Sequence, residues 1–86
     1  MPEISRFFGI IIKMFFDDHN PPHFHAEYSG NVALIDIRNL TVFSGNLPPR
    51  VKGFVIEWAS IHQQELIEDW ERSQTQQELF KIDPLT

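Results

Sequence analysis

A run of nine residues, from Asp17 to His25, gathers most of the side chains in this chain that could carry chemistry. It reads DDHNPPHFH and holds three of the four histidines, two acidic residues and a Pro-Pro pair. Histidine titrates near neutral pH and is the commonest metal ligand in proteins, while carboxylates supply oxygen ligands. The composition of this run therefore indicates a metal site or acid–base chemistry.

Two histidines of the run are expected on a strand. His23 and His25 lie two positions apart, so their rings project from one face of a strand and can approach the same ion. Glu27 continues this row, His19 can fold back across the Pro-Pro turn, and Asp17 or Asp18 can add an oxygen ligand. Such a set of imidazoles and carboxylates suits a divalent metal such as zinc, nickel or iron.

Two other interpretations of the histidine cluster compete with metal binding. Histidines beside a turn also donate hydrogen bonds to loop carbonyls and hold the turn together, or they are exposed and have no role. Alternatively, His23 and His25 act in acid–base catalysis. The spacing of the residues leaves these alternatives open.

A second polar group falls on a helix expected in the second half of the chain. His62, Glu65 and Asp69 lie near the middle of the apolar stripe of this helix, where an unpaired polar group costs roughly 1–3 kcal/mol. The simpler expectation is that the end of the helix overhangs the sheet, so that Glu65 and Asp69 reach water and His62 is a core histidine with a partner. The alternative is a pocket in which Glu65 orients His62 as a general base.

Strands are expected to position the histidine run. Residues 5–16 predict a first strand that is apolar on both faces, and its more apolar face would carry Phe8, Ile10, Ile12, Met14 and Phe16. Residues 17–22 form a turn with Pro-Pro punctuation. Three further strands are predicted at residues 23–28, 32–38 and 40–44, and together the four form an antiparallel meander.

One long helix is predicted from about Pro49 to Arg72, with proline in its first turn. At roughly 100° per residue, one broad apolar face comprises Val51, Phe54, Val55, Trp58, Ala59, Ile61, Leu66 and Trp70. Residues 79–85 form a short extended tail that adds an edge strand or covers the sheet. The expected fold is a single α+β domain over residues 1–86, with an antiparallel sheet of four or five strands and one long helix packed on one face.

The sheet face that the helix covers decides whether the two polar groups meet. Apolar side chains line one face of the strand at 23–28, namely Phe24, Ala26 and Tyr28. If the helix covers this face, His23 and His25 point away from it, and the apolar character of the face favours this arrangement. If the helix covers the opposite face, His23, His25, His62 and Glu65 form one constellation.

Composition excludes several classes of protein. The chain of 86 residues has no cysteine, which excludes disulfide scaffolds, thiolate nucleophiles and cysteine-type zinc sites. Its net charge of −5 disfavours nonspecific nucleic-acid binding. Residues 7–16 are apolar but too short for a membrane span, which needs roughly 20 residues, and they lack a signal cleavage site. A cytoplasmic protein without a membrane segment is therefore expected.

The doubly apolar first strand carries an expectation about partners. A strand that is apolar on both faces is usually covered on both faces. The chain offers one good helix for this purpose, so either the tail or a second subunit must cover the other face. A homodimer is therefore expected.

Several stretches of the chain resemble a family of small bacterial proteins, domain of unknown function 4160. They are MPEISRFFGIIIKMFFDDHNPPHFHAEY, LPPR, the EWA of the helix and KIDPL, which together cover nearly the whole chain. The matching residues are His19, Pro21, Pro22, His23, His25, Glu27, Leu47, Pro48, Pro49, Arg50, Glu57, Trp58 and His62. The resemblance implies a small cytoplasmic protein, often encoded beside a second short protein in a pair of the toxin–antitoxin-like kind.

Three hypotheses about function follow. The first is a regulatory or protein-interaction module that works as a homodimer or with a co-encoded small protein, in a toxin–antitoxin-like pair. The second is a small metal- or histidine-dependent hydrolase, such as a ribonuclease, built on His19, His23 and His25, although the acidic charge argues against it. The third is a passive metal-binding module. The sequence contains no Gly-rich phosphate loop and no G-x-S-x-G or H-E-x-x-H motif.

Overall fold

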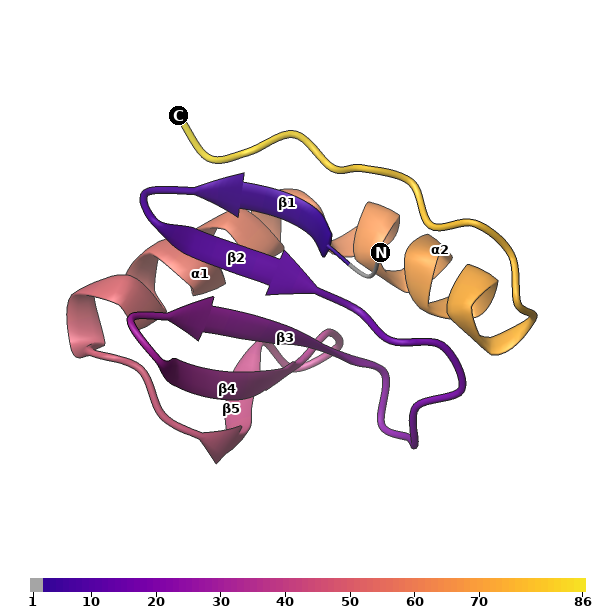
Figure 1. The fold of residues 1–86 in the computed structure, drawn as a ribbon, viewed down its shortest axis with the longest axis horizontal. Helices are drawn as coiled ribbons and strands as arrows, with labels where there is room; N and C mark the ends of the chain where they lie inside the picture. The colour runs from indigo at the N-terminus through magenta and orange to yellow at the C-terminus, as the bar shows by residue number, and fades with distance from the viewer. Residues whose placement is uncertain (1–2) are drawn as a thin grey trace.

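The computed structural model describes residues 3–86 and, within that range, shows an α+β fold with the strands first and the helices after (Figure 1). One antiparallel sheet has the strand order β1-β2-β3-β4-β5, as the meander pattern predicts. The elements are β1 (Glu3–Phe7), β2 (Ile10–Lys13), β3 (His23–Tyr28), β4 (Asn31–Asp36), β5 (Thr41–Gly45), α1 (Pro49–Ile61) and α2 (Gln63–Gln74).

The single first strand expected at residues 5–16 is wrong, because the chain reverses within it. Phe8 and Gly9 have φ angles of 52° and 77°, and they form a two-residue turn between β1 and β2. Two successive positive φ values match the twist of a tight hairpin, and glycine makes the second one inexpensive. Phe8 is exposed in this turn and Phe16 is exposed beyond the end of β2, so neither lies on the buried face as expected.

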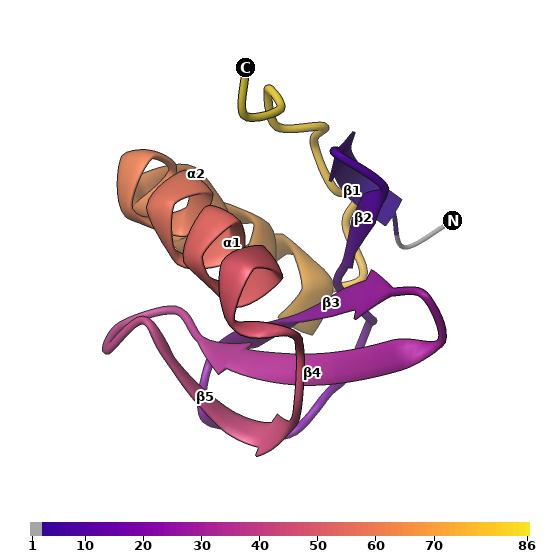
Figure 2. The ribbon, with the colours of Figure 1, turned by 90° about the vertical axis from the view of Figure 1, so that its left-hand side faces the viewer.

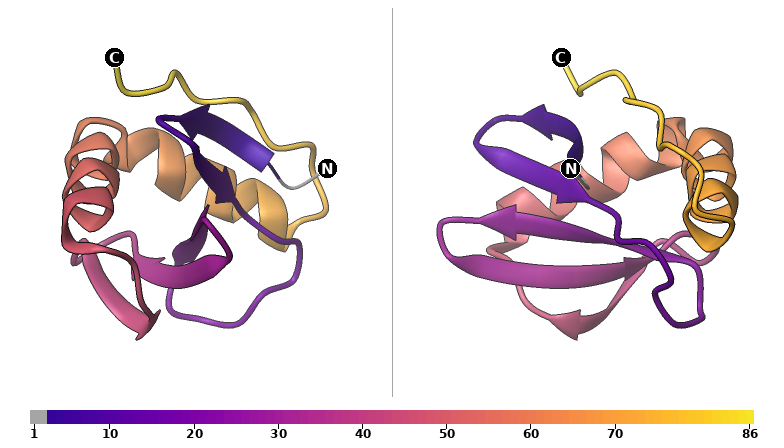
Figure 3. Two further views of the ribbon diagram at one scale, coloured as in Figure 1. Left: turned by 60° about the vertical axis from the view of Figure 1, so that its left-hand side comes forward. Right: turned by 45° about the vertical axis from the view of Figure 1, so that its right-hand side comes forward.

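The single long helix is also wrong, because the helix is interrupted at His62. His62 has φ −111° and ψ 23°, and it ends α1 and precedes α2. Neither proline nor glycine stands at the break, but the Gln63 side-chain amide donates hydrogen bonds to the carbonyls of Ile37 (2.7 Å) and Arg38 (3.1 Å) after β4. The two helices run in clearly different directions (Figure 3). Ile61, expected on the apolar face, is 62% exposed at this corner.

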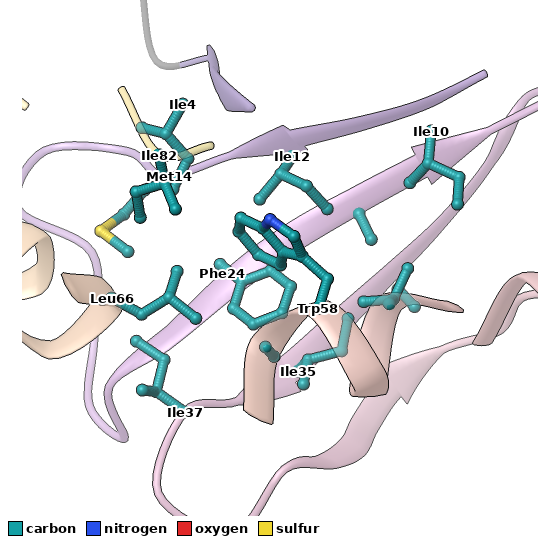
Figure 4. Close-up of a cluster of buried hydrophobic side chains, with 14 of the residues drawn as sticks. Ile4, Ile10, Ile12, Met14, Phe24, Ile35, Ile37, Trp58, Leu66 and Ile82 are labelled. Atoms are coloured by element: carbon teal, nitrogen blue, oxygen red, sulfur yellow. The ribbon is translucent and has the colours of Figure 1, made fainter. Parts of the chain in front are cut away.

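The sheet is curved, and both helices lie on its concave side (Figure 2). Trp58 of α1 is fully buried and contacts the rings of Phe24 in β3 and Phe7 in β1, with centroid distances of 5.7 and 5.4 Å. Isoleucines from β1, β2 and β4 surround it (Figure 4). The helices therefore cover the Phe24 face of the sheet, which is the face that the sequence favours.

The C-terminal tail covers one end of this core and is not a strand. It runs past α2 and alongside β1 (Figure 1). The Ile82 amide donates to the Ile4 carbonyl at 2.8 Å, and the Trp58 indole N–H donates to the Asp83 carbonyl at 2.8 Å. The Ile82 side chain is buried in the core and Leu79 and Leu85 are partly buried against it, so apolar contacts and a few hydrogen bonds hold the tail in place.

Across residues 3–86, no helix combines the length and the apolar character that a membrane crossing requires.

Candidate functional site

The connection between β2 and β3 carries the histidine run and packs against the end of α2. The Asp17 amide donates to the Ser73 carbonyl at 3.3 Å, and the Gln74 side chain donates to the Asp18 carbonyl at 3.3 Å. On the other side, the Ile37 amide donates to the Pro22 carbonyl at 3.0 Å. The loop is therefore held between α2 and the end of β4, and Asp18 is placed beside the start of β3.

Three of the predicted ligands come together in this loop. Asp18 Oδ2 lies 3.0 Å from His23 Nε2 and 3.2 Å from His25 Nε2. One ligand atom from each of the three residues lies within 4.8 Å of the other two. The alternation of β3 brings the two imidazoles to one face, as predicted, and the loop supplies the carboxylate.

Each side chain of this Asp18–His23–His25 cluster is held by further contacts. His23 Nδ1 donates to the Pro21 carbonyl at 2.7 Å, because a carbonyl oxygen can only accept. Asp18 Oδ1 accepts the His19 amide at 2.9 Å, which leaves Oδ2 turned toward the imidazoles. Hydrogen bonds of this kind orient metal-binding histidines and carboxylates in known metal sites.

The His23 contact to Pro21 has a chemical consequence. With its proton on Nδ1, a neutral His23 presents a lone pair from Nε2 toward the carboxylate oxygen of Asp18. Two lone pairs facing each other at 3.0 Å are favourable only when a cation lies between them, either a proton or a metal ion. The cluster is therefore arranged to hold a positive charge.

Aromatic rings surround the imidazoles. The His23 ring contacts Trp70 of α2 and Phe43 of β5, with centroid distances of 5.2 and 5.4 Å, and the His25 ring contacts Phe15 at 4.6 Å. The exposed fractions of the side chains are 5% for His23, 20% for His25 and 26% for Asp18. The sequence predicts that His23 points away from a helix that covers the Phe24 face. Its contact with Trp70 shows that the His23 ring nevertheless lies against α2. The cluster is closed on the His23 side and open on the side of Asp18 and His25.

The ionised form of Asp18 is favoured in this setting. Partial burial raises the pKa of the Asp18 carboxyl, but the hydrogen bonds from His25 and from the His19 amide, together with the His23 charge, outweigh it and lower the pKa. A ligand carboxylate must be ionised to bind a metal, and for His25 Nε2 to act as a ligand its hydrogen bond to Asp18 must be given up.

The two other predicted ligands lie outside the cluster. His19 is exposed, and only its backbone amide contacts Asp18. Glu27 pairs with Lys13 across the sheet at 3.0 Å. Among residues 3–86, the group with ligand atoms close enough to share one ion contains Asp18, His23 and His25, without His19 or Glu27.

The second polar group stays separate. His62 Nδ1 lies 2.5 Å from Glu65 Oε1, and the His62 ring packs on Trp58 at 5.5 Å. This pair occupies the corner between α1 and α2, and within the described residues no hydrogen bond or ring contact joins it to His23 or His25. The constellation of four residues that a helix on the opposite face would give is therefore not formed.

Asp69 departs from the sequence prediction that it reaches water. It is fully buried, and its Oδ1 accepts the Arg72 guanidinium at 2.8 Å and the Phe80 amide at 2.9 Å, while Oδ2 has no partner. Burial raises the pKa of the Asp69 carboxyl. The sequence carries one signal of this burial: Asp69 lies in the middle of the apolar stripe, and Arg72, a possible ion-pair partner, follows one turn later. Glu65, by contrast, reaches water as expected.

The Asp18–His23–His25 cluster offers two nitrogens and one oxygen, a donor set that suits zinc and other divalent transition metals. Three protein ligands leave at least one coordination position for water, substrate or another protein group. Because Asp18 and His25 are partly exposed, that position lies on the open side of the cluster.

Comparison with known proteins adds a family but no activity. The family model described as domain of unknown function (DUF4160) matches residues 9–71. This range includes the whole histidine run, all of α1 and most of α2. Neither the curated proteins nor the solved structures contain a match to this chain.

Proposed function

The chain belongs to the DUF4160 family, whose description assigns no activity, and on the geometry of the cluster we propose that it is a small module that binds a divalent transition metal. The ligands are Asp18 Oδ2, His23 Nε2 and His25 Nε2. Zinc is the first candidate, because it takes nitrogen and oxygen ligands in sets of this size.

The observation that carries this proposal is that one ligand atom from each of three side chains lies within 4.8 Å of the other two. Asp18 Oδ2 faces both Nε2 atoms at 3.0 and 3.2 Å, and the Pro21 carbonyl fixes the His23 tautomer that makes its Nε2 an acceptor. A loop built only to hold the turn would gain from one hydrogen bond per imidazole. His23 and Asp18 each make a second hydrogen bond, to the Pro21 carbonyl and from the His19 amide, and bonds of this kind orient the ligands in known metal sites.

Elemental analysis of untagged protein, purified without chelator, tests the proposal. We expect close to one zinc, nickel or iron ion per chain, and we expect its loss in Asp18→Asn and His25→Ala. His25 is the better histidine to change, because buried His23 also packs on Trp70 and Phe43 and its removal would disturb the fold. His62→Ala removes a histidine outside the cluster and is the matched control. Metal-free protein that also fails to bind added zinc would refute the proposal.

A metal-dependent hydrolase is the enzymatic form of the same proposal. A bound zinc lowers the pKa of its water to near neutrality and turns it into a nucleophile. The open side of the cluster supports such a reaction, and the acidic charge of the chain favours a substrate other than nucleic acid. Hydrolysis by loaded protein that disappears in Asp18→Asn would support this form, and equal hydrolysis by both proteins would refute it.

The second candidate is a regulatory interaction module, as the family context implies, and the outer face of the sheet supports it. By the strand register, Ile11, Val32 and Leu34 share this face with His25 and Glu27. Val32 is exposed, and so are the Phe15 and Phe43 rings that contact the histidines. Aromatic and apolar residues gathered on one face are typical of an interaction surface. Light scattering at high concentration tests for a homodimer, and mixing with a co-encoded small protein tests for the other partner.

A further inference from the structure

His19 is placed beside the cluster but takes no part in it. It follows Asp18 directly, and its amide fixes Asp18 Oδ1. The His19 side chain is exposed, and within residues 3–86 its ring makes no hydrogen bond or ring contact. An accessible imidazole therefore lies next to a set of ligands that is one short of the four that zinc takes in closed sites.

The open side of the cluster continues into an exposed aromatic rim. Phe15 contacts His25 and is 37% exposed, while Phe43 contacts His23 and is 46% exposed. A group that approached the open coordination position would also cover the Phe15 ring, which contacts His25 on that side. Burying this ring would stabilise the contact and remove water from around the ion, which strengthens its bonds to the ligands.

We propose that the metal joins two copies of this chain, with His19 of each copy completing the coordination of the ion held by Asp18, His23 and His25 of the other. The inference rests on the proposed metal site and names the partner of that site. Since His19 and the cluster occupy one loop, a two-fold axis between facing loops makes the exchange reciprocal and closes the assembly as a dimer.

Charge supports a metal-dependent rather than a spontaneous association. Each chain carries a net charge of −5, so two chains repel each other. A divalent ion bound at each cluster changes the net charge of each chain from −5 to −3, so the repulsion between the two chains is weaker in the loaded state. The association is therefore expected only in the loaded state.

Sedimentation equilibrium with zinc, and separately with chelator, tests the inference. With one zinc per chain we expect the molar mass to double from the 10.1 kDa of the single chain, and with chelator we expect it to return to that value. His19→Ala should still bind one zinc per chain but stay monomeric. His62→Ala, which removes a histidine elsewhere, should behave as the wild type.

Complementation gives a second measurement that a merely structural role of His19 would not produce. His19→Ala keeps an intact cluster, and His25→Ala keeps an intact His19. Neither variant alone should dimerise with zinc, but an equimolar mixture should form a mixed dimer that holds one ion.

Four results would overturn the inference. Zinc-loaded wild type that stays monomeric would refute it while leaving the metal site intact, as would zinc-dependent dimerisation of His19→Ala. If the wild type stays monomeric with zinc and His19→Ala binds zinc more weakly than the wild type, His19 binds the ion of its own chain. Wild type that binds no zinc at all would refute the proposed function and this inference together.

Discussion

Asp69 gives the sharpest test of how the helices hold the tail. This buried carboxylate accepts two donors at Oδ1, the Arg72 guanidinium at 2.8 Å and the Phe80 amide at 2.9 Å, and thereby joins α2 to the tail. Asp69→Ala removes both hydrogen bonds and leaves the Phe80 amide and Arg72 without this acceptor.

The expected loss follows from the two bonds. The neutral bond from Phe80 contributes about 0.5–1.5 kcal/mol and the charge-assisted bond from Arg72 about 1.5–3 kcal/mol. Removing a buried charge whose Oδ2 has no partner offsets part of this cost. The net loss expected for Asp69→Ala is therefore about 2 kcal/mol, or roughly 8–16 °C in Tm for a domain of this size.

Two variants serve as controls in the same thermal denaturation assay. Asp69→Asn keeps an oxygen acceptor in place and removes the charge, so it should lose less than Asp69→Ala. Glu71→Ala removes the same charge from an exposed position on α2, and its effect should stay within about 0.5 kcal/mol. The reasoning is refuted if Asp69→Ala and Glu71→Ala have the same Tm.

The pH dependence of the Asp69 effect has a defined sign. The folded pKa of Asp69 is raised by burial, so the folded state binds this proton more tightly than the unfolded state. The stabilisation from the protonated form is complete below the unfolded pKa and is lost as pH rises through the folded pKa. On acidification across this window, the wild type should gain stability relative to Asp69→Asn. The opposite shift of Asp18 is present in both proteins and cancels in the comparison.

Three further predictions concern the end of β5, the tail and the cluster. Gly45→Ala should lower the free energy of unfolding by roughly 2–4 kcal/mol in chemical denaturation, because φ is +73° and the added Cβ would overlap the Val32 carbonyl. Gly53→Ala in α1 places its Cβ in open space and should raise this free energy by about 0.5–1 kcal/mol, so equal effects of the two changes would contradict the reasoning. Trp58→Phe keeps a buried ring but removes the donor to the Asp83 carbonyl, so amide hydrogen exchange should accelerate more in the tail than in the sheet. Equal acceleration in both would count against a role of this hydrogen bond in holding the tail. Zinc at 100 times its Kd should stabilise the protein by about 2.7 kcal/mol, or roughly 10–20 °C in Tm, and a Tm indifferent to zinc would argue against the site.

Local pattern was sufficient for some parts of the site and not for others. The spacing of His23 and His25 places both rings on one face of a strand, because successive side chains alternate. Asp18, His19 and Glu27 were all predicted as further ligands, but the sequence could not show which of the three lies close enough to His23 and His25 to share an ion. The Ser73 carbonyl accepts the Asp17 amide and the Gln74 side chain donates to the Asp18 carbonyl, and these two residues, more than 50 positions away, settle the path of the loop.

The two errors in the fold have a common physical origin. The Phe8–Gly9 turn is embedded in a run of apolar residues, so the hydrophobic pattern continues through a chain reversal that backbone conformation decides. The break at His62 lacks proline and glycine, and contacts from Gln63 to residues after β4 accompany it. In both places periodicity does not indicate where the chain changes direction, and Phe8 and Ile61, which it places on a buried face, are exposed at the two reversals.

The sequence by itself determined the order of strands and helices, the antiparallel meander, the apolar face of β3 and the concentration of histidines in one run. These features depend on side-chain type and spacing, which are local properties of the chain. Tertiary structure alone decided that Asp18 joins His23 and His25, that His19 stays free at the rim, and that Asp69 is buried beneath the tail. The path of the Asp18 loop depends on hydrogen bonds to α2, and the burial of Asp69 depends on the path of the tail, so both exist only after the helices have packed on the sheet.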